Sequence, residues 1–166
     1  SMTYLLPHLI EQAAEVDPAH PALRNRGETL TYGELLERSS ALAHALIEDG
    51  VAPGDRVGIL LPKSLHSAIA LYGIMAAGAV YVPLDPGSPV SRIAFVLRDC
   101  SITRLVSEDR FLPTLSALGE AGARIDSVFG IDDGQDAPFT TIPWREVATR
   151  PATPPQIATT EQDLCY

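Results

Sequence analysis

The order of apolar and polar positions predicts regular alternation of strands and helices after residue 50. Continuous apolar runs, of the kind that suits a strand buried on both faces, recur four times, and stretches with helical periodicity separate them. We expect strands over residues 56–62, 79–84, 103–107 and 123–131, and helices over residues 65–78, 89–100 and 109–119. This alternation predicts an α/β fold with an open, mostly parallel sheet flanked by helices.

The first fifty residues carry a different pattern. Residues 4–16 predict an amphipathic helix, and residues 21–32 contain two short extended runs that predict a hairpin. The apolar stripe of that helix consists of Leu5, Leu6, Leu9, Ile10 and Ala13. Thr31 and Glu34 stand three apart before an apolar-periodic stretch, which is typical of a capping box. We therefore expect a second helix that begins there and ends near residue 50.

Two serines and a proline-rich region complete the predicted elements. Ser64 is expected to cap the helix over residues 65–78, and Ser88 the next helix, with Pro89 at its first position. Residues 132–160 are rich in Pro, Asp and Thr and predict a surface connection within one domain, with one short helix at residues 143–148. The closing residues 163–166 predict the start of another strand.

Composition and charge narrow the class of protein. The 166 residues suit one domain, and 46% hydrophobic with 20% charged residues is typical of a globular protein. The net charge of -9 repels phosphate backbones and anionic lipid surfaces, so we expect neither a nucleic-acid nor a membrane partner. No secretory signal pattern and no membrane-length apolar run is present, which favours a cytoplasmic protein. Ser1 before Met2 is interpreted as a cloning remnant.

The candidate chemistry is sparse. Cys100 and Cys165 lack ligand spacing and are expected to be free thiols, and four histidines, His8, His20, His44 and His66, show no metal pattern. No glycine-rich phosphate loop is present. Gly73 and Gly78 are interpreted as a helix-packing position and a helix C-cap.

The remaining polar candidates favour structural roles. Ser64 and His66 lack the third group of a catalytic triad. The carboxylate pairs Glu108-Asp109 and Asp132-Asp133 are interpreted as solvated turn residues rather than acid–base catalysts. Lys63 is interpreted as a surface lysine, although its place before a helix start would also suit an anion.

One strand-to-helix corner is more specific. Pro83 lies near the end of a predicted strand, and residues 85–88 turn the chain into the next helix. Such a corner belongs to the carboxyl edge of the sheet, where α/β proteins bind ligands. A corner that only shapes the fold is the alternative interpretation, and it is the one we favour.

Three segments together resemble the adenylate-forming enzymes, a superfamily of acyl-CoA synthetases, peptide-synthetase adenylation domains and luciferases. They are "LTYGELLERSSALAHAL" (30–46), "GVAPGDRVGILLPKS" (50–64) and "MAAGAVYVPLDPGSPVSRIAFVLRDC" (75–100). The resemblance is specific in order and spacing over about residues 3–110. Residues 30–35 match the family's first core motif and residues 76–85 its second. Met75-Ala76 replace the usual Leu-Lys pair, which favours acyl- or aryl-CoA ligases, whereas "YVPLDP" and "SRIAFVLRD" favour amino-acid adenylation.

The resemblance implies an ATP-dependent activation of a carboxylic or amino acid, followed by transfer to coenzyme A or a carrier-protein thiol. Asp163, Leu164 and Tyr166 resemble the lead-in to the family's phosphate-binding loop. Residues 1–166 are therefore interpreted as an N-terminal piece of such an enzyme, inactive alone. ATP and Mg²⁺ belong to the parent enzyme, and neither is expected to bind well to this piece. We assign no catalytic, cofactor-binding or metal-binding residue.

Two other classes stay open. A standalone, non-catalytic α/β binding or interaction module would explain the acidic surface, and an unfinished sheet edge would then favour self-association. A flavodoxin-like response or electron-carrier domain fits the length and the α/β pattern. It is disfavoured because "RVGILLPKS" (56–64) offers neither an acidic cluster nor a flavin phosphate loop.

Overall fold

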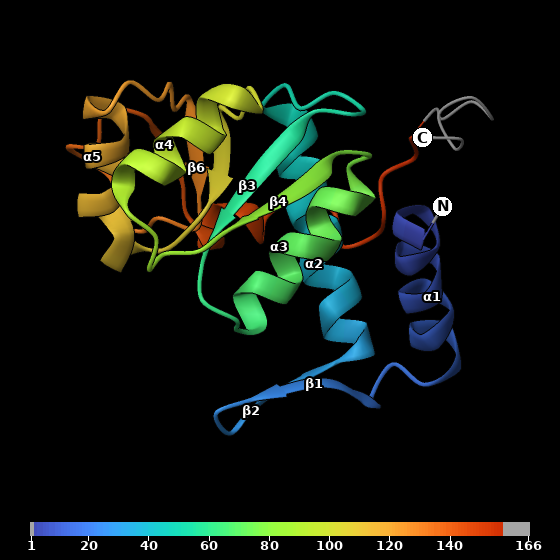
Figure 1. Cartoon of the computed structure of the whole chain (residues 1–166). Helices are drawn as coiled ribbons and strands as arrows, with labels where there is room; N and C mark the ends of the chain where they lie inside the picture. Colours follow the sequence, from blue (N-terminus) through green and yellow to red (C-terminus); the bar gives the residue numbers. More distant parts are fainter. Residues whose placement is uncertain (1, 158–166) are drawn as a thin grey trace.

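A five-stranded parallel sheet forms the centre of the molecule (Figure 1), whose computed structural model describes residues 2–157. Its order is β4-β3-β5-β6-β7, and each neighbouring pair runs parallel. The strands are β3 (Arg56–Leu60), β4 (Val80–Leu84), β5 (Arg104–Val106), β6 (Ser127–Phe129) and β7 (Thr140–Ile142). The predicted α/β class is confirmed. The strand expected at residues 163–166 lies outside the described residues.

Helices cover both faces of the sheet (Figure 1). One face is covered by α2 (Tyr32–Glu48) and α3 (Leu65–Ala76), with α1 (Met2–Val16) packed against these two helices farther from the sheet, and the other face by α4 (Val90–Asp99) and α5 (Leu112–Glu120). Neighbouring strand residues divide between two cores. Leu105 and Val128 pack with the α4–α5 layer, whereas Val106 and Phe129 pack with the α2–α3 layer. Alternating side chains on buried strands thus explain why the apolar runs are continuous.

The segment before α2 forms as the sequence predicts. Strands β1 (Pro21–Asn25) and β2 (Glu28–Thr31) pair antiparallel. The two residues between them, Arg26 and Gly27, have φ of 50° and 82°, as the preferred two-residue hairpin turns require. At the start of α2 the Thr31 hydroxyl accepts the Glu34 amide at 3.1 Å, and the Glu34 carboxylate accepts the Thr31 amide at 3.1 Å. The predicted capping box is confirmed.

Four expectations need correction. Strand β7 was not predicted, because Thr140–Ile142 is not a continuous apolar run of the kind that marked the other strands. The helix expected over residues 109–119 divides into a 3₁₀ turn, η1 (Asp109–Phe111), and α5, which has a proline in its first turn. Leu9 is 56% exposed, since among residues 7–16 of α1 the buried side chains are those of Ile10 and Ala14. Ser88 does not cap α4: its amide donates to the Asp85 carbonyl, and the helix starts one residue later than predicted.

The last described segment, residues 149–157, is named the strap. It follows the short helix α6 (Trp144–Val147) and runs past α2 and α3 to the groove that α3 forms with α1 (Figure 1). The Arg150 guanidinium donates to both Glu48 carboxylate oxygens, at 2.7 and 3.1 Å, and His44 Nε2 lies 2.9 Å from the Thr153 carbonyl oxygen. These contacts hold the strap against α2, as expected of a surface connection. No helix among residues 2–157 is long and apolar enough to cross a bilayer.

Candidate functional site

The strand order marks one place on the sheet as the candidate ligand site. Along the chain β4 adds to one side of β3 and β5 to the other, so the winding reverses between β3 and β5. Doubly wound α/β folds bind ligands outside the carboxyl ends of the strands at this reversal. We call this side of the sheet the carboxyl edge. Besides the corner after β4, polar and aromatic residues follow the ends of the other four strands: Lys63, Ser64, His66, Ser107, Glu108, Asp109, Asp132, Asp133, Trp144 and Arg145.

The start of α3 does not offer a nucleophile. The Ser64 hydroxyl accepts the Ser67 amide at 3.1 Å, and the Ser67 hydroxyl accepts the Ser64 amide at 2.8 Å. This second capping box occupies both side chains. His66 Nε2 lies 3.2 Å from the Arg38 guanidinium instead of contacting Ser64. The structure therefore supports the interpretation that Ser64 and His66 are not part of a triad. Lys63 is exposed, as expected of a surface lysine.

The two carboxylate pairs of the sequence meet in space. The Asp109 carboxylate accepts the amides of Asp132 at 2.6 Å and Asp133 at 3.1 Å, so it fixes the loop after β6. Arg145 lies 3.7 Å from the Asp132 carboxylate. The interpretation as turn residues is supported, but sequence spacing did not predict that the pairs touch. No group of three or more His, Cys, Asp or Glu within the described part of the chain could hold a metal ion.

Ser107 is a buried residue of the carboxyl edge that sequence reasoning missed. Its hydroxyl donates to the Leu60 carbonyl at 2.8 Å and ties the end of β5 to the end of β3, across the reversal point. Gly130, with φ of 99°, lies so close that a Cβ there would stand 2.3 Å from the Ser107 carbonyl oxygen. Only glycine permits this approach. The ends of β3, β5 and β6 at the carboxyl edge are thus held together by contacts that involve their backbone.

His66 is the second residue that sequence reasoning underrated. Its ring stacks on Trp144 with 4.9 Å between ring centroids and 11° between planes. Burial lowers the pKa of His66, and the positive charge of Arg38 lowers it further, while nearby carboxylates oppose the change. The ring is therefore held neutral to a lower pH than an exposed histidine. Only a long-range contact reveals this, since the two aromatic residues stand far apart in sequence.

The two glycines and the corner act as predicted. A Cβ on Gly73 would stand 2.8 Å from a methyl carbon of Leu42, so α2 and α3 approach closely there. Gly78 has φ of 77° just after the end of α3, as a C-cap position requires. Asp85 Oδ1 accepts the Gly87 amide at 2.9 Å and shapes the turn into α4. Cys100 is a free thiol, and Cys165 lies outside the described residues.

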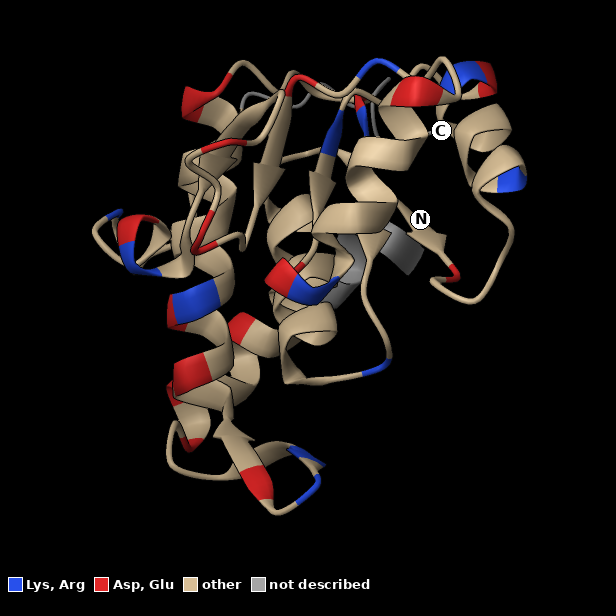
Figure 2. Ribbon diagram, turned by 90° about the vertical axis from the view of Figure 1, so that its left-hand side faces the viewer, with Lys and Arg blue, Asp and Glu red and all other residues tan. Residues whose placement is uncertain are grey.

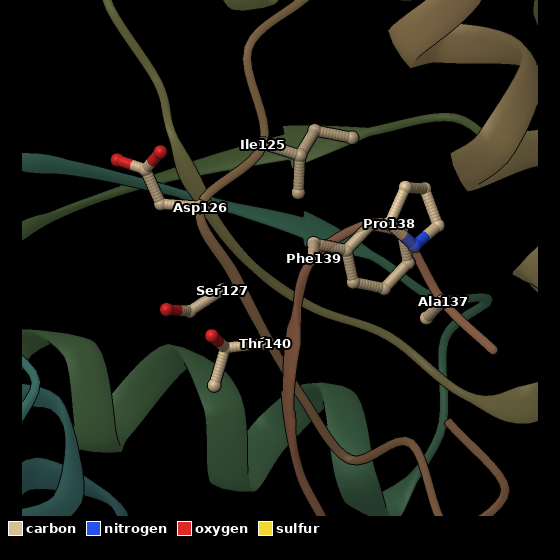
Figure 3. A pocket seen from close by; sticks show the side chains of 7 residues that line it. All are labelled: Ile125, Asp126, Ser127, Ala137, Pro138, Phe139 and Thr140. Carbon is tan, nitrogen blue, oxygen red and sulfur yellow. The ribbon is translucent and has the colours of Figure 1, made fainter. Parts of the chain in front are cut away.

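An open depression lies at the opposite, amino edge of the sheet (Figure 3). Its lining includes Asp126, Ser127 and Thr140, which stand at the starts of β6 and β7. Helices of a parallel α/β fold end near this edge, and their carboxyl ends disfavour anions. Figure 2 shows Lys and Arg scattered over several elements rather than gathered on one. The helix ends therefore favour the carboxyl edge over the amino edge for a nucleotide phosphate.

These features define an open, doubly wound α/β domain whose candidate ligand site is the carboxyl edge. Its strand order is also that of flavodoxin-like folds, so the order alone does not identify the family. Residues 10–166 match the family described as AMP-binding enzyme. The chain therefore belongs to the AMP-binding enzymes, as its sequence motifs predicted.

The curated relatives include two large bacterial synthases. The chain is 39% identical to bacitracin synthase 1 of Bacillus licheniformis over 100 residues, covering 60% of this chain and 2% of the relative. It is 38% identical to tyrocidine synthase 3 of Brevibacillus parabrevis over 125 residues, covering 75% of this chain and 2% of the relative. The chain thus spans a small part of the length of these relatives.

Solved structures share the fold. The anthranilate CoA ligase AuaEII in complex with anthranoyl-AMP superimposes with a TM-score of 0.81 at 20% identity, over 95% of this chain and 29% of that one. The nonribosomal peptide synthetase FmoA3, in its α-methyl-L-serine-AMP bound form, has a TM-score of 0.71 at 27% identity, over 92% of this chain and 15% of that one. The first likeness shows the fold alone.

Proposed function

We propose that this chain is part of an enzyme that activates an amino acid with ATP and passes it to a thiol. The amino-acid carboxylate attacks the α-phosphorus, the bond to pyrophosphate breaks, and an aminoacyl-adenylate forms. A thiol of a carrier protein then attacks the acyl carbon, and AMP leaves. The observation that carries this proposal is the family match over residues 10–166. We expect the enzyme to work in the cytoplasm.

Within that enzyme, we infer that residues 2–157 act as a scaffold. The described residues do not fit an ATP phosphate site: the first turn of α3 is closed by the Ser64–Ser67 capping box, and Asp109 occupies the amides of Asp132 and Asp133. A phosphate needs such amides or cationic groups. We therefore propose that ATP and Mg²⁺ are held by other residues, and that the 166-residue chain alone does not catalyse adenylation.

The amino acid is preferred over an aryl or fatty acid because of the relatives. FmoA3, whose structure holds an amino-acid adenylate, is 27% identical to this chain, whereas the anthranilate CoA ligase of similar fold is 20% identical. Met75-Ala76, which depart from the Leu-Lys pair, favour the CoA ligases. In the structure Met75 and Ala76 end α3, away from the carboxyl edge where this helix begins, and line a groove with Pro154 of the strap. We give the departure less weight for that reason.

ATP–pyrophosphate exchange tests both parts of the proposal. The assay would use the 166-residue chain and, separately, the longest product of its gene, each with panels of amino acids, aryl acids and fatty acids. We expect exchange only with the longest product and only with amino acids. Exchange with aryl or fatty acids alone would assign the CoA-ligase class, and exchange by the 166-residue chain would refute the scaffold role.

A standalone interaction module is the alternative, and the sheet edges bear on it. β4 is an edge strand with Val80 46% exposed, which favours pairing with another chain. Pro83 lies in the same strand and lacks a backbone donor, which disfavours it. Sedimentation velocity over a range of concentrations separates the two: a monomer at every concentration argues against the module.

A further inference from the structure

The ring of His66 joins three elements at the carboxyl edge. It belongs to the first turn of α3, stacks on Trp144 at the start of α6, and meets the guanidinium of Arg38 in α2 at 3.2 Å. Because α6 has four residues and follows β7 directly, this contact connects the far edge of the sheet with the helical layer. The three side chains are named the latch.

Trp144 also lies against the backbone after β6. A Cβ placed on Gly130, which follows β6, would stand 3.0 Å from the indole nitrogen. The indole therefore packs directly against the backbone of Gly130. The imidazole of His66 lies nearly parallel to the indole plane. This stack fixes the plane of the His66 ring, and in the structure the Nε2 atom of that ring faces Arg38.

The contact with Arg38 determines where the His66 proton is. A guanidinium only donates hydrogen bonds and stays charged at all accessible pH values. The Nε2 atom at 3.2 Å must therefore accept, which places the proton of the neutral ring on Nδ1. A second proton would have to bind at Nε2. It would turn the acceptor into a donor that faces another cation.

We propose that the latch is a proton-operated contact: neutral His66 joins α2 to α6, and protonation of Nε2 detaches Arg38 while the ring stays stacked on Trp144. The stack survives because an imidazolium is also attracted to an indole face. The proton that binds comes from solvent, since the residue is half-buried. The detached Arg38 side chain is exposed and swings into solvent.

The charges around His66 come from four elements. Burial and Arg38 of α2 lower its pKa, whereas Glu108 after β5, Glu28 of β2 and Asp132 after β6 raise it, and the lowering prevails. Below the usual value of about 6.5, the unfolded chain then binds more protons than the folded chain. The free energy of unfolding therefore falls as the pH drops through this range. Removing Arg38 should raise the folded pKa.

Trp144 makes this testable in the intact chain, because it is the one tryptophan of the sequence. Its fluorescence would be titrated between about pH 8 and pH 5, where histidine changes charge. We expect quenching as the imidazolium forms, with a midpoint below that of the urea-unfolded chain. Arg38→Gln should raise the midpoint. Arg124→Gln, on the amino side of β6 and 80% exposed, is the matched control and should leave it unchanged.

Two further measurements guard against misfolded variants. His66→Gln should abolish the titration while the far-UV circular dichroism stays that of the parent. Nitrogen-15 spectra of the parent at neutral pH should show an unprotonated Nε2 and a protonated Nδ1. The proposal is overturned by a titration that persists in His66→Gln, by a midpoint that Arg38→Gln does not move, or by a proton on Nε2 in the neutral ring.

Discussion

Gly73 of α3 lies tightly against Leu42 of α2, and replacing it with alanine gives a sharp test of the packing. The new Cβ would stand 2.8 Å from Cδ2 and 3.0 Å from Cβ of Leu42, a fully buried side chain. The Cβ atom of Leu42 cannot move without its helix. Overpacking of this kind costs about 1–3 kcal/mol, whereas the change from glycine to alanine in a helix gains about 0.8–1.0 kcal/mol.

Gly119 in α5 separates these two contributions. It is also helical, but nothing lies within 4 Å of a Cβ placed there. Gly119→Ala should therefore stabilise the chain by about 0.5–1 kcal/mol. Gly73→Ala should be less stable than Gly119→Ala by about 1–3 kcal/mol, since the difference isolates the steric cost.

Urea unfolding of the 166-residue chain, followed by circular dichroism, measures both variants of this pair. Leu42→Ala alone creates a cavity, so it is combined with Gly73→Ala in a double-mutant cycle, where we expect a favourable coupling. Equal stability of Gly73→Ala and Gly119→Ala would show that α2 and α3 do not approach as the structure describes.

Two further pairs of variants test local hydrogen bonds by the same unfolding measurement. Thr31→Ala should cost about 1 kcal/mol by removing the cap of α2, whereas Ser88→Ala should be near neutral, because Ser88 makes no capping bond; an equal loss in both would contradict the cap assignment. Ser107→Ala should cost about 1–3 kcal/mol, since it removes the buried donor to the Leu60 carbonyl. Ser40→Ala should cost nothing or stabilise, because the buried Ser40 hydroxyl has no hydrogen-bond partner among the described residues; a loss there as large as that of Ser107→Ala would show a partner after all.

The fold was largely predictable because its main signals are local. Buried parallel strands such as β3 read as continuous apolar runs, and Thr31 with Glu34 marks a helix start within four residues. The misses are also physical. Strand β7 is held by pairing with β6 rather than by its own pattern, and the exposure of Leu9 depends on how α1 is rotated against its neighbours.

The candidate site was much less predictable. Ser107 looks like any loop serine in the sequence, and its role follows from the Leu60 carbonyl, 47 positions away. The stack of His66 on Trp144 likewise joins α3 to α6, so no motif contains both residues. The strand order and the helix packing bring these side chains together, and their spacing along the chain does not predict these contacts. The roles of Gly73 and Gly78 were predictable, because a glycine within a helix segment and a glycine at its end are recognised from the local sequence.

The strap completes a return path across the described part of the sheet. The chain leaves β7 at one margin through α6 and the strap, and Ile157 lies beside Gly78, two residues before β4 at the other margin. The short helix α6 and the nine residues of the strap thus return the backbone to the other margin without a long crossover helix. The hydrogen bonds of Arg150 and Thr153 to α2 therefore fix the path of the segment that joins the two margins of the sheet. Removing either bond would loosen this whole segment and not only one surface contact.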